Sequence, residues 1–373
     1  MRCSARQLIR RGLGLLLLMG TAALLAGCLF TMNHPQVTAD GTVALFLSTD
    51  GGYMLFPETD VLHLLRDGEW VAVPGATLHG AGGLMDLSPD DAEALYVDVR
   101  PGEFRDPLRS TLYRVALGPD AVPEPILETE DAIMKAVWVQ EDRILLLRFG
   151  DGEATLQSLD PAAGRAEGLA GDLLSFEVLP GRAEVFLLAV DQNGEPSIGS
   201  VVRWDLVTDR RETLATVVLS EATVEAFVMM PGDVLWDVSP DGAWVALSLY
   251  DGTMIEPAVE VEVPSLYLVD TEFGEAERIA LEALMPAFSP DGAALIYAVG
   301  AEDGLAVLMY RDLASGESMR VPGSEGLSTA FWLSPTTLGL TFESGEDHYR
   351  LVELDLTTEQ TRELVGAVTE ASD

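Results

Sequence analysis

The sequence predicts an all-β fold, a β-propeller of seven four-stranded antiparallel blades, with six or eight blades as alternatives. Two of the observations behind this prediction are repeats: a tight-turn motif returns about every 48 residues along the chain, and a second hairpin signal follows each copy. The third is composition. Of the 373 residues 48% are hydrophobic, so the chain can bury a large core despite a formal charge of −39.

Residues 1–27 predict a bacterial export signal. Four arginines precede an apolar run over 13–26, which is shorter than the roughly 20 residues that a membrane span needs. The run ends in "LAGC" (25–28), which resembles the lipobox of bacterial lipoproteins. That resemblance implies cleavage before Cys28 and acylation of Cys28. An ordinary signal peptide with a chance cysteine is the alternative.

This interpretation divides the chain into a signal (1–27), a lipidated cysteine with a short tether (28–36) and a propeller domain (37–373). The expected location is outside the cytoplasm. The lipid would anchor the protein to a bacterial membrane, either on the periplasmic side of the outer membrane or on the outer face of the plasma membrane. Removing the signal takes away four arginines and no acids, so the charge changes from −39 to −43. Nucleic acid is therefore not an expected partner.

The first repeat is seen best in "VSPDGAWVALSL" (238–249) and "FSPDGAALIYAV" (288–299). Proline presets φ at the second turn position, aspartate can accept local N–H groups, and glycine adopts the positive φ that closes the turn. The apolar run after each turn predicts a strand covered on both faces. Five weaker copies complete the series, and the positions aligned with the motif serine are 38, 88, 140, 179, 239, 289 and 334.

The second repeat predicts the other hairpin of each blade. Strand-like residues end in an aspartate, a short polar turn follows, and a more polar strand comes next, as in "LYLVDTEFGEAERIAL" (266–281). Four antiparallel strands per unit are typical of a propeller blade. The segment 217–233 is an insertion, and we expect it to cover an opening or to form a short helix.

These units resemble the WD40-like propeller repeats with a Ser-Pro-Asp-Gly turn that occur in TolB-like proteins. Three units carry Ser-Pro-Asp outright, at 88–90, 239–241 and 289–291. The resemblance implies the fold. It also implies that ligands bind over the central channel, at the end of the ring that carries the loops between the second and third strands and the loops between consecutive blades.

Those seven loops are rich in acids, with 19 Asp or Glu among 64 residues against 61 among 373 overall. An acidic face that attracts a cationic partner is one interpretation, and ordinary exposed polar loops are the other. The candidate residues are Asp98, Glu103, Asp151, Asp191, Glu195, Asp251, Glu256, Glu302, Asp303, Glu346 and Asp347.

The favoured function is a binding or scaffold module of the cell envelope, with a protein or other envelope ligand as partner. An enzyme that acts on a carbohydrate or peptide is the alternative. No catalytic residue is assigned, although His79 and His348 lie in loops that could reach the same face. No cofactor motif is evident, and calcium at 191–195 is a weaker alternative. We expect His63 to be a strand residue and Trp138, Trp236 and Trp332 to lie in the core.

Overall fold

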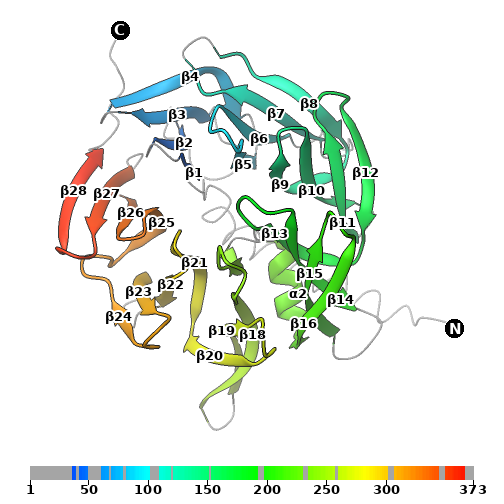
Figure 1. The fold of residues 1–373 in the computed structure, drawn as a ribbon. Coiled ribbons are helices and arrows are strands. Elements are labelled where there is room, and N and C mark those ends of the chain that lie inside the picture. Colours follow the sequence, from blue (N-terminus) through cyan, green and yellow to red (C-terminus); the bar gives the residue numbers. More distant parts are fainter. Residues whose placement is uncertain are drawn as a thin grey trace, which may run out of the picture.

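The computed structural model describes residues 36–38, 42–48, 60–66, 69–78, 81–100, 109–118, 121–150, 153–191, 197–229, 234–256, 259–300, 306–343 and 349–365. Their strands form seven four-stranded antiparallel sheets arranged in a ring (Figure 1). The predicted seven-bladed propeller is confirmed. The signal 1–27 and Cys28 lie outside the described residues, so the domain boundaries stay predictions.

Each blade is a meander of four consecutive strands, named A to D from the centre of the ring outward. Blade 1 consists of β1 (Gln36–Val37), β2 (Val43–Ser48), β3 (Asp60–Arg66) and β4 (Glu69–Leu78). Blade 2 consists of β5 (Ala81–Leu87), β6 (Glu93–Arg100), β7 (Arg109–Ala116) and β8 (Glu124–Thr129). Blade 3 consists of β9 (Ala132–Gln140), β10 (Arg143–Gly150), β11 (Glu153–Asp160) and β12 (Arg165–Ala170).

The other four blades repeat this order. Blade 4 consists of β13 (Leu173–Val178), β14 (Glu184–Asp191), β15 (Ser197–Asp205) and β16 (Arg210–Leu219). Blade 5 consists of β17 (Trp236–Val238), β18 (Trp244–Glu256), β19 (Val259–Asp270) and β20 (Ala276–Leu281). Blade 6 consists of β21 (Ala283–Phe288), β22 (Ala294–Gly300), β23 (Ala306–Asp312) and β24 (Ser318–Arg320). Blade 7 consists of β25 (Leu327–Ser334), β26 (Thr337–Glu343), β27 (Tyr349–Asp355) and β28 (Gln360–Val365).

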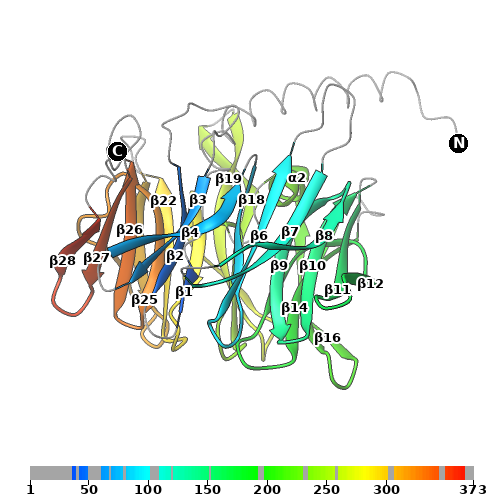
Figure 2. The ribbon, with the colours of Figure 1, turned by 90° about the horizontal axis from the view of Figure 1, so that it is seen from above.

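The strands run between two ends of the ring (Figure 2). At one end, called the turn end here, lie the A–B and C–D turns. At the opposite end, called the loop end, lie the B–C loops and the D–A connections. Every predicted motif position lies where an A strand meets a B strand, which is why the sequence repeat marks one end of the ring.

The Ser-Pro-Asp-Gly turns are closed by their own side chains. In blade 5, Ser239 Oγ donates to Asp241 Oδ1 at 2.7 Å, and the same carboxylate accepts the Ala243 N–H at 3.0 Å. Ser239 Oγ also accepts the Trp244 N–H at 2.9 Å, where strand B begins. Gly242 has φ 76°, the conformation for which glycine was expected.

The C–D turns have a recurring closure of their own. The aspartate that ends strand C accepts the backbone N–H groups two and three residues later in four of these turns, for example from Glu272 at 2.8 Å and Phe273 at 3.1 Å onto Asp270. In a fifth turn, Asp312 accepts one N–H, from Ser315 at 2.7 Å. The aspartates that do this are Asp160, Asp205, Asp270, Asp312 and Asp355. The second predicted hairpin is thereby explained residue by residue.

Seven apolar clusters fill the seven interfaces between adjacent blades. Strand B supplies both sides, because successive side chains point to opposite faces. In β10, Ile144 and Leu146 pack toward blade 2, whereas Leu145 and Leu147 pack toward blade 4. The predicted core tryptophans Trp138, Trp236 and Trp332 are all buried.

The ring closes by packing between its first and last blades. Among the described residues, no strand from one end of the chain joins the sheet of the other end. Of the side chains that the structure describes, four buried apolar ones join blades 7 and 1 at this closing seam: Val43, Leu65, Phe331 and Leu351. The described part of the interface between blades 4 and 5 contains sixteen.

The insertion 217–233 contains a short helix, α2 (Glu221–Met229), as one of the two expectations proposed. Ser220 caps it, accepting the Thr223 N–H at 3.1 Å. Phe227 of α2 is buried in the cluster between blades 4 and 5. The helix therefore packs against both blades at the loop end. No helix of the described residues is long and apolar enough to cross a membrane.

Candidate functional site

Most of the predicted acidic face falls outside the described residues. This holds for Glu103, Asp151, Glu195, Glu302, Asp303, Glu346 and Asp347, and for the loop histidines His79 and His348. Glu256 belongs to β18, but its side chain is not described. Three candidates, Asp98, Asp191 and Asp251, can be placed.

Asp98 and Asp191 lie at or near the ends of B strands in blades 2 and 4, but their surroundings differ. Asp98 is 1% exposed, so its carboxylate is not part of an open surface. Asp191 is exposed at the loop end. His63 is a half-buried strand residue, as expected, and its Nδ1 lies 2.9 Å from the Val61 carbonyl oxygen.

Asp251 is held within blade 5 by three neighbouring side chains. Ser265 Oγ donates to Asp251 Oδ1 at 2.5 Å, and Tyr267 Oη donates to Oδ2 at 2.6 Å. The Arg278 guanidinium lies 3.5 Å from the same carboxylate. Burial, together with the bond to this carboxylate, raises the pKa of Tyr267. Asp251 therefore ties β18, β19 and β20 together.

The structure reveals further acids at the loop end that sequence reasoning missed. Asp131, Asp172 and Glu282 each precede the first strand of a blade by one residue, in blades 3, 4 and 6. Because first strands lie nearest the centre of the ring, these inner-rim acids come from three blades around the axis (Figure 1). An acid directly before these three A strands was the available signal, but only the B–C loops were counted.

Two of the inner-rim acids are fixed by their backbone. Asp172 has φ 55° and Glu282 has φ 51°, a left-handed conformation that is uncommon without glycine. Their carbonyls accept N–H groups from the ends of B strands, from Val190 at 2.8 Å and from Gly300 at 3.1 Å. Both side chains are exposed and form no hydrogen bond or ion pair with the described residues.

The third inner-rim acid is partly neutralised. Asp131 Oδ2 forms an ion pair with Arg148, which also donates to Thr129 and Gln157. A side chain at Gly150 would collide with the Asp131 carboxylate, since its Cβ would lie 2.2 Å from Oδ1. Asp131 is thus fixed in place but offers less negative charge than Asp172 or Glu282.

The aspartates of the Ser-Pro-Asp turns have a structural explanation that Asp172 and Glu282 lack. Asp291 accepts the Ser289 hydroxyl at 2.6 Å and the Ala293 N–H at 3.1 Å, and these bonds hold its pKa below the ordinary value. The same two kinds of bond lower the pKa of Asp90. The negative charge at Asp172 and Glu282 has no comparable role in a turn.

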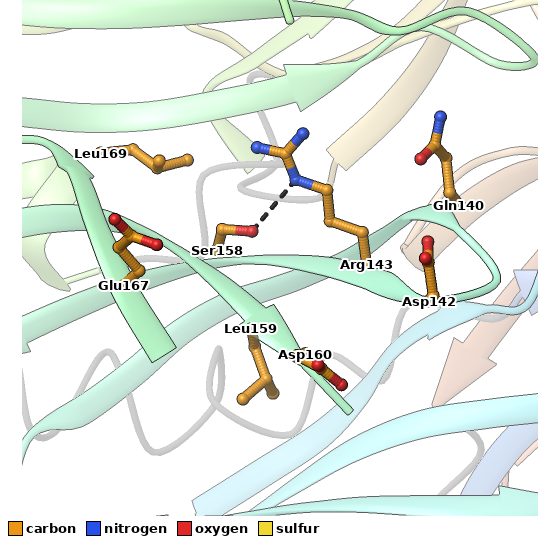
Figure 3. Close-up of a pocket in the computed structure, with 8 residues that line it drawn as sticks. All are labelled: Gln140, Asp142, Arg143, Ser158, Leu159, Asp160, Glu167 and Leu169. Carbon is orange, nitrogen blue, oxygen red and sulfur yellow. Dashed lines mark hydrogen bonds between the residues drawn. The ribbon is translucent and has the colours of Figure 1, made fainter. Parts of the chain in front are cut away.

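A polar hollow of about 440 Å³ lies at the turn end of blade 3 (Figure 3). It is formed by the A–B turn, the end of strand C and strand D. Its lining residues are Gln140, Asp142, Arg143, Ser158, Leu159, Asp160, Glu167 and Leu169. Arg143 Nε donates to Ser158 Oγ at 3.0 Å.

Within the part of the chain that the structure describes, no group of three or more His, Cys, Asp or Glu side chains is arranged to hold a metal ion. The suggested calcium segment 191–195 is described only at Asp191, so that alternative stays a prediction.

Solved structures with TM-scores above 0.5 support the fold. The β-propeller domain of the trilobed protease of Pyrococcus furiosus is 13% identical, with a TM-score of 0.57 over 88% of this chain and 92% of that one. An oligogalacturonate lyase in complex with manganese is 11% identical, with a TM-score of 0.55 over 89% and 85%. TolB from Acinetobacter baumannii is 13% identical, with a TM-score of 0.45 over 86% and 78%. No protein-family model and no curated protein matches the chain. The chain is a β-propeller protein, and at these identities the likeness concerns the fold.

Proposed function

We propose that this protein is an exported, lipid-anchored β-propeller that acts as a binding or scaffold module of the cell envelope and recruits a cationic partner at its loop end. The signal-like residues 1–27 and the lipobox-like "LAGC" (25–28) support the export and the anchor at Cys28. The fold supports a role as a binding module, because a rigid ring of blades presents loops from distant parts of the chain at one end.

The observation that carries the proposal is the pair Asp172 and Glu282. Both carboxylates are exposed at the inner rim, in blades 4 and 6, and neither is engaged by a described side chain. Their backbones are fixed by hydrogen bonds to the ends of neighbouring B strands. Fixed negative charges on a strongly acidic protein attract positive ligands and accelerate their encounter.

The test uses a lysine-rich peptide as the probe and fluorescence anisotropy as the readout. We expect the full chain to bind the peptide more weakly as salt rises, because exposed charges are screened. Neutralising Asp172→Asn and Glu282→Gln together should weaken binding about fivefold, which corresponds to about 1 kcal/mol for two exposed pairs.

The matched control removes two charges at the turn end, Glu272→Gln and Glu317→Gln, both exposed. Equal losses in the two double variants would show that net charge alone attracts the peptide, and the inner rim would have no special role. The anchor is tested separately by the mass of the N-terminal peptide. An unacylated Cys28, or a Cys28→Ser variant that stays with the membrane, would contradict it.

A further inference from the structure

The hollow in blade 3 lies at an A–B turn that lacks the full turn motif. In blade 5 five residues, 239–243, separate strands A and B, whereas in blade 3 only Glu141 and Asp142 do. The shorter turn brings strand residues to the turn end. Gln140 ends strand A and Arg143 begins strand B, and both line the hollow.

The hollow contains opposite charges that do not pair with each other. Arg143 is half-buried, and its one hydrogen bond to a described residue uses Nε, which donates to Ser158. Glu167 and Asp142 form no ion pair or side-chain hydrogen bond with the described residues. Figure 3 shows Glu167 on one side of the guanidinium group and Asp142 with Gln140 on the other.

The hydrogen bond to Ser158 accounts for the separation between the Arg143 guanidinium group and the carboxylates. It holds the guanidinium group over β11, so the terminal nitrogens of Arg143 point into the hollow instead of folding onto a carboxylate (Figure 3). Guanidinium nitrogens bind carboxylates in a paired geometry, and carboxylates bind ammonium groups by charge-assisted hydrogen bonds. The hollow therefore offers a guanidinium group held in place by Ser158 and, beside it, carboxylates that can bind an ammonium group.

We infer that this hollow binds a small zwitterion, a free α-amino acid or a very short peptide. Arg143 would receive the ligand's carboxylate, and Glu167 would receive its ammonium group. An apolar ligand would strip water from several charged groups without replacing their hydrogen bonds. A simple anion meets more carboxylates than cations in the lining, and a simple cation leaves Arg143 without a partner.

The test titrates the full chain with L-alanine and follows ligand signals by saturation-transfer NMR. Propionate and ethylamine carry the two charged halves of alanine separately, and methyl glucoside is a neutral polar probe. We expect saturable alanine binding, with both halves at least about tenfold weaker because each loses one charge-assisted bond. Binding should also disappear near pH 10.5, where the ammonium group of alanine is deprotonated.

Arg143→Gln and Glu167→Gln should each weaken alanine binding about tenfold. Arg165→Gln is the matched control, because Arg165 is exposed on the same blade, outside the lining, and has no described partner. Glu167 is exposed, so its variant should fold normally even if Arg143→Gln does not. Absent binding, equal binding of propionate, ethylamine or methyl glucoside, or unchanged binding in Glu167→Gln would each overturn the inference.

Discussion

Oδ2 of Asp237 in blade 5 accepts a hydrogen bond of 2.7 Å from the backbone N–H of Phe288 in blade 6. Asp86 in blade 2 does the same for Trp138 in blade 3, also at 2.7 Å. Both aspartates stand two residues before a motif serine, so one position of the repeat joins neighbouring first strands. These bonds add direction to interfaces that are mainly apolar.

Replacing Asp237 by alanine should destabilise the protein by about 1–3 kcal/mol, because the Phe288 N–H would be left without its acceptor. Urea unfolding followed by tryptophan fluorescence measures the loss. Glu272→Ala is the control, since exposed substitutions usually change stability by less than about 0.5 kcal/mol. Equal midpoints for the two variants would show that this bond between blades contributes nothing.

The Ser-Pro-Asp-Gly turns predict a defined dependence of stability on pH. The Ser289 hydroxyl and the Ala293 N–H hold the pKa of Asp291 below the value of about 3.9 expected in the unfolded chain. The ionised carboxylate therefore stabilises the fold above about pH 4, and this contribution is lost as the pH falls through the folded-state pKa.

Asp291→Asn should accordingly be less stable than the natural protein at pH 7, and the difference should shrink below pH 4. Measuring the difference between the two proteins removes the general effect of their large negative charge, which both share. Urea midpoints between pH 7 and pH 2.5 provide the data. A stability difference that stayed constant over that pH range would show that the loss comes from the changed shape of the side chain and not from ionisation of Asp291.

The blades were predictable because each tight turn demands particular residue types. Proline, aspartate and glycine have separate tasks in a turn such as 239–242, and they leave a signal that survives in degenerate copies. The 39-residue step between positions 140 and 179 is the shortest of the series. It follows the short turn at Glu141 and Asp142, where the hollow lies.

The candidate site was less predictable because charge in a sequence does not reveal exposure. Asp98 and Asp191 occupy similar places in their repeats, yet one is buried and the other exposed. Asp251 is engaged by Ser265 and Tyr267 from the next strand, a contact that depends on register. Asp172 and Glu282 were missed since a D–A connection of one or two residues has no motif.

The helix α2 depends on Thr223, a fully buried threonine that bonds to strand β18 in both directions. Thr223 Oγ1 accepts the Tyr250 N–H at 2.8 Å and lies 3.2 Å from the Tyr250 carbonyl oxygen. Thr223→Val keeps the shape but removes these bonds, and it should cost about 1–3 kcal/mol. Hydrogen exchange should rise in 221–229, whereas exposed Thr216→Val should leave exchange there unchanged. Unaltered exchange in Thr223→Val would show that packing of Phe227 alone holds the helix.

The closing seam can be tested at Gly339, which lies beneath the ring of Phe331. A Cβ at Gly339 would lie 2.3 Å from Cζ of Phe331, so an alanine must displace that ring. Phe331 is one of the four buried residues that join blades 7 and 1. Gly339→Ala should therefore destabilise the protein by about 1–3 kcal/mol and increase hydrogen exchange in both blades.

A double-mutant cycle identifies the cause. Phe331→Leu alone should destabilise the protein by removing apolar contacts, but combined with Gly339→Ala it should recover part of the loss, because the smaller side chain makes room for the methyl group. Additive losses would mean that the two sites act independently and that the clash is relieved elsewhere. Increased exchange in blade 4 as large as that in blades 1 and 7 would show that the loss of stability is not local to the seam.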